Sequence, residues 1–155
     1  ICTASDQDIR FIIAGDIDPD NPASITLKES QSFSQFRNVT FLGFRNDIAD
    51  LFSNSHIVVL PSYREGLPKV LIEAAACGRA VITTDVPGCR HVIIPDVTGL
   101  LVEPKNAFDL AKAINQLVTN HKMRAQFGIA GRKLAEDKFS LEEISRMYIN
   151  LYRKI

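Results

Sequence analysis

The sequence predicts an α/β protein with a doubly wound parallel sheet, and two patterns carry this prediction. Short runs rich in β-branched residues alternate with segments of helical periodicity, and the runs are apolar throughout instead of alternating with polar residues. Continuously apolar strands are typical of a parallel sheet that helices cover on both faces. The repeated strand–helix–strand order also favours right-handed βαβ units. The predicted strands are residues 9–14, 39–42, 56–60, 80–84 and 99–102.

Residues that favour helix ends predict where the helices lie. Pro68 suits a first helical turn and Gly78 a stop, so a helix is expected over residues 68–77. Ser140 and Glu143 form a capping-box pattern for a last helix that runs to the C-terminus. The other expected helices are residues 24–36 with Ser24 as cap, 46–53 with Asn46, 106–118 with Asn106, and 122–138.

The composition excludes several classes of protein. The chain has 155 residues, 46% of them hydrophobic, and 18 basic side chains balance 18 acidic ones, which argues against disorder and against a nucleic-acid partner. The length fits one domain, and no apolar run approaches the roughly 18 residues of a membrane-spanning helix. The three cysteines Cys2, Cys77 and Cys89 form no close pair. They predict neither a disulfide framework nor a zinc site, and they favour a reducing, cytoplasmic location.

The charge is unevenly distributed along the chain. Residues 121–155 hold 8 basic and 4 acidic side chains, whereas residues 1–120 hold 10 basic and 14 acidic ones. Two interpretations remain open for the basic end. It forms solvated helices, or it contacts a second domain or an anionic surface, such as the cytoplasmic face of the inner membrane.

The segment after the third predicted strand is the most informative part of the sequence. Ligands of open α/β sheets bind outside the carboxyl ends of the strands, where this segment begins. Glu73 lies there on a helix whose other members are almost all apolar, so the helix is expected to be buried and its carboxylate to need partners. The partners are hydroxyl groups of a ligand or, alternatively, backbone amides or a nearby arginine.

A second acid, Glu65, lies in the loop that leads into this helix. Gly66 beside it permits close backbone approach or an unusual dihedral angle. Pro68 contributes no amide hydrogen, so the free amides at the helix start are those of Lys69, Val70 and Leu71. Such a helix start favours phosphate, and the carboxylates favour hydroxyl-rich groups. A nucleotide sugar has both parts, although Glu65 is alternatively an ordinary exposed loop acid.

The two glutamates, separated by seven residues, match the E-x7-E motif of retaining glycosyltransferases with the two-domain GT-B fold. The surrounding sequence resembles family four of that group, and nearly the whole chain takes part. The resemblance implies the Rossmann-like C-terminal half of a GT-B fold without its first strand and helix. Residues 1–155 would then be the donor-binding domain of a larger two-domain protein. Similar strings fall in the family's order at residues 12–15, 39–43, 59–62, 84–88, 99–102 and 139–140.

The resemblance also implies roles for individual residues. Glu65 is the expected catalytic residue and binds hydroxyl groups of the donor sugar, while Glu73 holds the ribose 2′- and 3′-hydroxyls. The remaining residues implied to bind the donor are Gly66 and Leu67 at the sugar, Lys69 and Val70 at the diphosphate with Pro68 before them, Gly15 at the pocket floor, and Gly43, Phe44 and Arg45 at the base. Arg64 is a loop cation near the expected diphosphate or, alternatively, part of a structural salt bridge.

The resemblance implies a donor, partners and a class of acceptor. The donor is a UDP-linked hexose or N-acetylhexosamine, and the acceptor is a glycan or polyprenyl-linked oligosaccharide of surface polysaccharide synthesis. No metal or other cofactor is expected, because amides and basic side chains stabilise the leaving diphosphate. Leu67 and Pro68 replace the Phe-Gly common in the family, and its acceptor domain and its Arg/Lys clamp have no counterpart here. The chain alone is therefore expected to be inactive.

Two other classes of function remain as alternatives. A nucleotide-sugar 2-epimerase shares the two-domain fold, although the glutamate motif favours a transferase. A non-catalytic nucleotide-binding module of dinucleotide or receiver type is the other. The dinucleotide version requires a Gly-x-Gly-x-x-Gly pattern after the first strand, whereas Gly15 is followed here by Asp-Ile-Asp-Pro.

Overall fold

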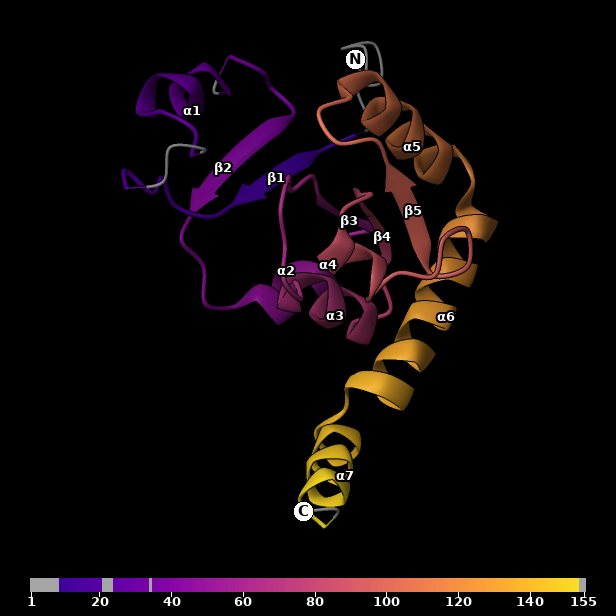
Figure 1. Cartoon of the computed structure of the whole chain (residues 1–155). Coiled ribbons are helices and arrows are strands. Elements are labelled where there is room, and N and C mark those ends of the chain that lie inside the picture. Colours follow the sequence, from indigo (N-terminus) through magenta and orange to yellow (C-terminus); the bar gives the residue numbers. More distant parts are fainter. Residues whose placement is uncertain (1–8, 21–23, 34, 154–155) are drawn as a thin grey trace. The chain divides into compact units, whose positions relative to one another are not determined.

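A computed structural model describes residues 9–20, 24–33 and 35–153 (Figure 1). The chain divides into two compact units, with the boundary between Ile48 and Ala49. We call residues up to 48 the first unit and residues from 49 onward the second unit, and each is described by itself. Cys2 lies outside the described residues.

The first unit contains two parallel strands and a helix. Its elements are β1 (Phe11–Ala14), α1 (Leu27–Phe33) and β2 (Val39–Gly43). The expected cap at Ser24 is wrong, because the helix begins three residues later, after Thr26. There the Thr26 hydroxyl accepts from the Glu29 amide, and the Glu29 carboxylate accepts from the Thr26 amide at 2.7 Å. Along β1, half-buried and exposed residues alternate, so this strand is not buried on both faces as expected.

The second unit contains a three-stranded parallel sheet in the order β3-β4-β5. The expected strands are all present, with ends that differ from the predicted ones by at most two residues. The elements from the unit boundary onward are α2 (Ile48–Ser53), β3 (Ile57–Leu60), α3 (Lys69–Ala76), β4 (Ala80–Thr84), α4 (Pro87–Arg90), β5 (Gly99–Val102), α5 (Ala107–Thr119), α6 (His121–Phe139) and α7 (Leu141–Tyr152).

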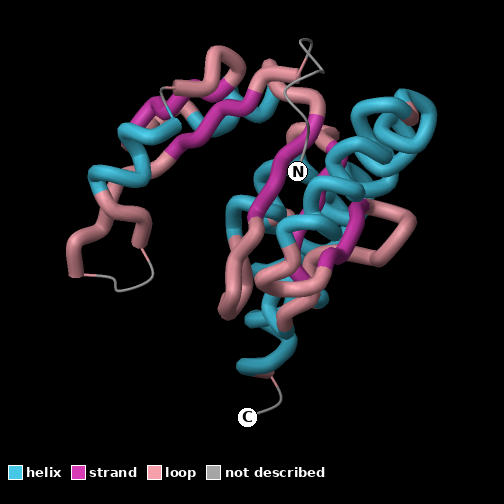
Figure 2. The backbone as a smooth tube through the Cα atoms, turned by 90° about the horizontal axis from the view of Figure 1, so that it is seen from above, coloured by secondary structure: helices cyan, strands magenta, loops and turns pink. Residues whose placement is uncertain are grey.

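Helices cover both faces of this sheet, as Figure 2 shows. The central strand β4 is buried at every position. Val81 packs on one face with Leu71 of α3 and with residues of α4, whereas Ile82 packs on the other face with Leu117 of α5 and with residues of α6. The doubly wound α/β class is therefore confirmed, and its two apolar layers meet at β4.

The helix ends agree with the sequence at two of the expected caps. The side chain of Asn106 accepts from the Asp109 amide, and that of Ser140 accepts from the Glu143 amide. The expected start of α6 at Lys122 is wrong by one residue, because Asn120 caps it. The helical turn α4 was not predicted. Its four residues lack any periodic pattern, although Pro87 at its first position was a start signal.

None of the helices in the described part of the chain is long and apolar enough to cross a membrane.

Candidate functional site

The loop between β3 and α3 is fixed to β4 by two buried threonines. The hydroxyl of Thr83 donates to the carbonyl of Leu60 at 2.8 Å, and the hydroxyl of Thr84 donates to the carbonyl of Ser62. Both threonines are almost fully buried. Because a buried hydroxyl needs a partner, these bonds define where the chain leaves β3. The sequence predicted both residues as part of a strand, and Thr84 also as the start of the family-like string at residues 84–88, but neither as a partner of this loop.

Gly88 of α4 fixes the middle of the same loop. A Cβ atom on Gly88 would lie 2.4 Å from the carbonyl oxygen of Glu65 and 2.5 Å from that of Gly66. Only a glycine allows this approach of two backbones. At Gly66 a Cβ would meet no atom within 4 Å, and its φ lies outside the left-handed region. The close approach within the protein is thus made by Gly88, and the space beside Gly66 is open.

Glu65 is half-buried and lies near the thiol of Cys89. Burial raises the pKa of the Cys89 thiol, and the negative charge of Glu65 raises it further. The sulfur lies 3.1 Å from the hydroxyl oxygen of Thr83, whose single hydrogen already goes to the Leu60 carbonyl. A buried thiol with a raised pKa stays protonated and is a poor nucleophile. Cys89 is therefore a packing residue beneath Glu65.

Glu73 is exposed, which corrects the expectation that its helix is buried on all sides. Leu71, Ala74 and Ala75 form the buried face of α3, while Glu73 and Lys69 lie on its exposed side. Among the described residues, no hydrogen bond or ion pair involves the Glu73 carboxylate. Neither of the alternative partners is therefore found, because no backbone amide and no arginine among the described residues bonds to this carboxylate. The carboxylate is therefore accessible to a ligand.

The start of α3 offers two free amides, not three. The amide of Leu71 donates to the carbonyl of Pro68 at 3.1 Å, which removes it from the expected set. For the amides of Lys69 and Val70, no acceptor is found within the described residues. Pro68 itself is buried and extended, with φ −72° and ψ 103°. The helix thus begins with two N–H groups that have no acceptor among the described residues, at the positive end of its dipole.

Two further predicted residues of this loop are exposed. Leu67 has 51% of its surface accessible, and Arg64 is also exposed. Within the described ranges, no ion pair involves Arg64. In contrast, Arg90 forms an ion pair with Asp85, and its guanidinium group lowers the pKa of that carboxyl. Of these two loop arginines, Arg64 is thus the one whose positive charge has no acidic partner among the described residues.

The predicted residues of the first unit meet at the carboxyl ends of β1 and β2. The amide of Gly15 donates to the carbonyl of Gly43 at 2.9 Å, and φ is positive at both glycines. Phe44 has 73% of its surface exposed. Arg45 forms two hydrogen bonds with Asp47, which lowers the pKa of that carboxyl and raises the pKa of the guanidinium. The charge of Arg45 is therefore already matched within its own loop.

A hollow at the carboxyl edge of the second unit was not predicted. Its volume is about 450 Å³, and neither Glu65 nor Glu73 lines it. The ammonium group of Lys105 lies 5.5 Å from the ring centroid of Tyr63, within range of a cation–π contact. The position of residues 103–106 directly after β5 was the available signal. The lining residues are Pro61, Tyr63, Thr84, Val102, Glu103, Lys105, Asn106, Ala107 and Leu110.

Metal ligands are not clustered in the part of the chain that the structure describes. No group of three or more His, Cys, Asp or Glu side chains there has the arrangement of a metal site.

The family model described as "Glycosyl transferases group 1" matches residues 1–134. The chain belongs to this family. A Campylobacter jejuni relative, named N,N'-diacetylbacillosaminyl-diphospho-undecaprenol alpha-1,3-N-acetylgalactosaminyltransferase, is 35% identical over 94% of the chain. The Staphylococcus aureus capsular polysaccharide biosynthesis glycosyltransferase CapM is 30% identical over 96% of it. The chain spans 37% and 40% of the lengths of these two relatives.

Solved structures agree with this assignment. The C-terminal domain of the group 1 protein LpcC from Francisella tularensis matches with a TM-score of 0.71 and 25% identity, over 88% of this chain and 91% of that one. A TarM mutant from S. aureus, solved in complex with UDP and other ligands, matches with a TM-score of 0.81 and 28% identity over 96% of this chain and 30% of that one. The expected fold, a C-terminal glycosyltransferase domain, is therefore confirmed.

Proposed function

We propose that the chain is the donor-binding domain of a retaining glycosyltransferase that uses a UDP-linked hexose or N-acetylhexosamine. The observation that carries this proposal is the set of unpaired groups around the start of α3. Two accessible amides, at Lys69 and Val70, lie between the carboxylates of Glu65 and Glu73 in the sequence, and neither carboxylate has a hydrogen-bonded partner among the described residues. Amides suit a diphosphate, and carboxylates suit sugar hydroxyls.

Each group then has a distinct task in the reaction. Glu73 accepts hydrogen bonds from the ribose 2′- and 3′-hydroxyls, which holds the nucleoside at the side of α3. The amides of Lys69 and Val70 and the helix dipole stabilise the negative charge that develops on the leaving diphosphate. Glu65 accepts from hydroxyls of the donor sugar, with Arg64 as a cation nearby. The bond between the anomeric carbon and the diphosphate oxygen breaks as the acceptor hydroxyl attacks from the same side, so the anomeric configuration is retained, and the proton of the hydroxyl passes to the leaving diphosphate. No metal is required, because the amides and the helix dipole stabilise that diphosphate.

The family resemblance is the basis for assigning donor-binding roles to residues of the first unit. Gly43, Phe44 and Arg45 border the base, and Gly15 lines the floor. The acceptor is bound by an N-terminal domain of the same longer protein. This part of the proposal is supported by the share of the relatives that the chain spans, 37–40% of their length.

The acceptor is a glycan or a polyprenyl-diphosphate-linked oligosaccharide of surface polysaccharide synthesis. The support is the name of the C. jejuni relative, which acts on a diphospho-undecaprenol substrate with an N-acetylgalactosaminyl group, and that of CapM, which acts in capsular polysaccharide biosynthesis. Because a polyprenyl acceptor is held in a membrane, the protein would work at the cytoplasmic surface of the inner membrane.

The proposal is tested by calorimetric titration of the full-length protein with UDP, GDP, ADP and NAD. We expect UDP to bind best and Glu73→Ala to weaken UDP binding about tenfold or more, since a hydrogen bond to a charged group contributes about 1.5–3 kcal/mol. Tighter binding of NAD than of the other nucleotides would reject a sugar-nucleotide site. Proton NMR of the product, with and without a chelator, tests retention of configuration and independence of metal.

A further inference from the structure

A second pocket lies at the amino ends of the strands in the second unit, at the edge opposite to the proposed donor site. His56 directly precedes β3, and Arg79 directly precedes β4. The pocket has a volume of about 510 Å³, which lies within the range of small-molecule sites, about 300–1,000 Å³. The charged and titratable side chains of its lining are His56, Arg79, His121, Arg124 and Arg132.

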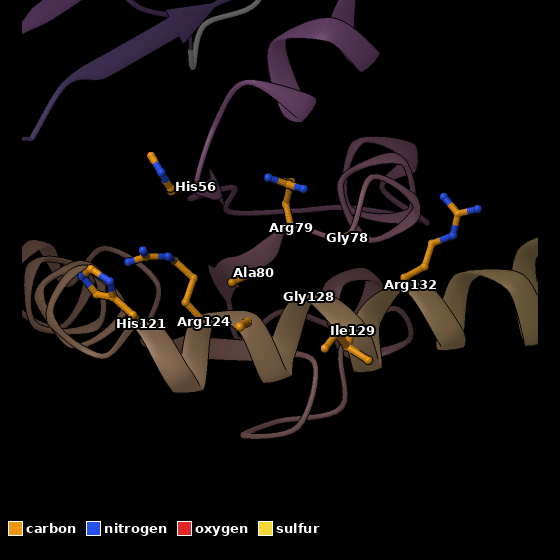
Figure 3. Close-up of a pocket in the computed structure, with 10 residues that line it drawn as sticks. His56, Gly78, Arg79, Ala80, His121, Arg124, Gly128, Ile129 and Arg132 are labelled. Atoms are coloured by element: carbon orange, nitrogen blue, oxygen red, sulfur yellow. The ribbon is translucent and has the colours of Figure 1, made fainter.

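The lining is basic, and no acidic side chain of the described residues takes part in it. Figure 3 shows His56, His121 and Arg124 toward one end of the pocket and Arg132 at the other, with Gly78 and Gly128 between them. Six of the lining residues, from His121 to Arg132, belong to residues 121–155, which hold 8 basic and 4 acidic side chains. Such a concentration of positive charge attracts anions.

Carbonyl groups hold two of the arginines in place. Arg79 donates through Nε to the carbonyl of Cys77 at 2.9 Å and through Nη1 to that of Ser55 at 3.0 Å. Arg124 donates through Nη1 to the carbonyls of Leu117 and Val118 at 2.8 and 3.1 Å. These bonds satisfy carbonyls near helix ends, which is a common structural role of arginine.

This structural role leaves some N–H donors of Arg79 and Arg124 unused. A guanidinium group has five N–H donors, and the observed bonds use only Nε and Nη1 of Arg79 and only Nη1 of Arg124. Within the described residues, no hydrogen bond involves Nη2 of Arg79, Nε or Nη2 of Arg124, or the rings of His56 and His121. Two arginines held in place with spare donors require little further ordering to bind an anion.

Glycine contacts keep the middle of the pocket open. A Cβ atom on Gly128 would lie 2.2 Å from the carbonyl oxygen of Gly78, so α6 and the turn before β4 meet backbone to backbone. No side chain from either position can then fill the space between the basic groups. Arg132 differs from the other two arginines, because Glu136 pairs with it. Within the described residues no ion pair involves Arg79 or Arg124, so these two arginines carry the unmatched positive charge of the pocket.

We propose that this pocket binds a phosphate group of a ligand other than the sugar donor. Guanidinium groups match phosphate oxygens in geometry and charge, and the histidines add further donors when protonated. The phosphate belongs either to a soluble phosphate ester or to the headgroup of an anionic lipid. The site is separate from the donor site, so it can be tested whether or not the proposed sugar transfer is correct.

The direct test places a negative charge inside the pocket and, as a control, outside it. His121→Glu adds a carboxylate to the pocket, whereas Gln126→Glu adds one at an exposed position of the same helix that does not line the pocket. Inorganic pyrophosphate is titrated into the full-length variants by calorimetry. We expect His121→Glu to weaken binding about tenfold or more, as expected for like charges a few ångströms apart, and Gln126→Glu to change it by less than about twofold.

A second pair of variants removes charge and identifies the source of the phosphate. Arg124→Gln and the control Lys133→Gln each lose one positive charge from α6, but only Arg124 lines the pocket. Cosedimentation with phosphatidylglycerol vesicles is measured beside the pyrophosphate titration. Selective loss of pyrophosphate binding in the pocket variants supports a soluble ligand, and selective loss of vesicle binding supports a lipid headgroup. If pocket and control variants bind both probes equally, the proposal is overturned.

Discussion

The two edges of the β3-β4-β5 sheet carry opposite chemistry. At the carboxyl edge, the carboxylates of Glu65 and Glu73 accompany the free amides at the start of α3. At the amino edge, Arg79 and Arg124 donate to carbonyls near the ends of α2, α3 and α5. The polarity of the βαβ unit explains this difference, because it gathers helix starts at one edge and helix ends at the other. Helix starts favour anionic ligands directly, whereas helix ends hold the cationic side chains of Arg79 and Arg124, whose remaining donors form the proposed phosphate site.

The largest expected effect comes from the contact that holds the carboxyl edge in shape. Gly88→Ala places a Cβ atom 2.4 Å from the Glu65 carbonyl oxygen, against backbone that cannot move alone. We expect a loss of about 1–3 kcal/mol in the free energy of unfolding and clearly weaker UDP binding. Denaturant unfolding and calorimetry measure both.

Gly66→Ala is the matched control for the stability measurement. A Cβ at Gly66 meets nothing within 4 Å, so its effect on the free energy of unfolding should stay within about 0.5 kcal/mol. Equal stability of the two alanine variants would show that Gly88 does not hold the loop.

A smaller effect is expected from the hydroxyl that ties the loop to β4. Thr84→Val keeps the shape of the side chain but leaves the Ser62 carbonyl without its donor. We expect a loss of about 0.5–1.5 kcal/mol in the free energy of unfolding, the net contribution of one hydrogen bond. Thr84→Ser keeps the hydroxyl and should retain most of the stability. Thermal unfolding compares the two, and an equally stable valine variant would exclude a role for this bond.

The smallest effect concerns the thiol beneath Glu65. The raised pKa of Cys89 predicts little alkylation by iodoacetamide near pH 8, whereas the half-buried Cys77 should react faster in the same peptide map. Since the thiol loses its proton more easily in the unfolded chain, the contribution of Cys89 to stability is complete below the ordinary thiol pKa. This contribution falls as the pH rises from the ordinary thiol pKa through the raised pKa of Cys89 in the folded protein. Faster labelling of Cys89 than of Cys77 would contradict the described burial.

The sequence predicted the strands and the loop of the site well, because both depend on local patterns. Apolar runs such as residues 80–84 indicate buried strands, and the spacing of Glu65 and Glu73 resembles the family when it is taken together with the ordered strings along the chain. The sequence did not predict the exposure of Glu73. Val70 and Ile72 made α3 look apolar on every side, yet both are only partly buried. Which side of a short helix has neighbours is decided by tertiary packing.

Contacts between distant segments were also beyond the sequence. Gly88 approaches Glu65 across 23 positions, and Thr84 reaches Ser62 across 22. Nothing in the local pattern of either residue encodes its partner. The basic pocket is a similar case, because His56, Arg79 and Arg124 come from three separate segments. The uneven charge of residues 121–155 was its only visible trace.

The central claim is that the Glu73 carboxylate binds the two ribose hydroxyls of the donor. The most direct measurement compares UDP with 2′,3′-dideoxy-UDP on the full-length protein and on Glu73→Gln, with Glu142→Gln, an exposed glutamate of α7, as control. We predict that Glu73→Gln weakens UDP binding about tenfold or more and leaves the affinity for the dideoxy nucleotide unchanged. An equal loss for both nucleotides, or no loss for UDP, would contradict the account.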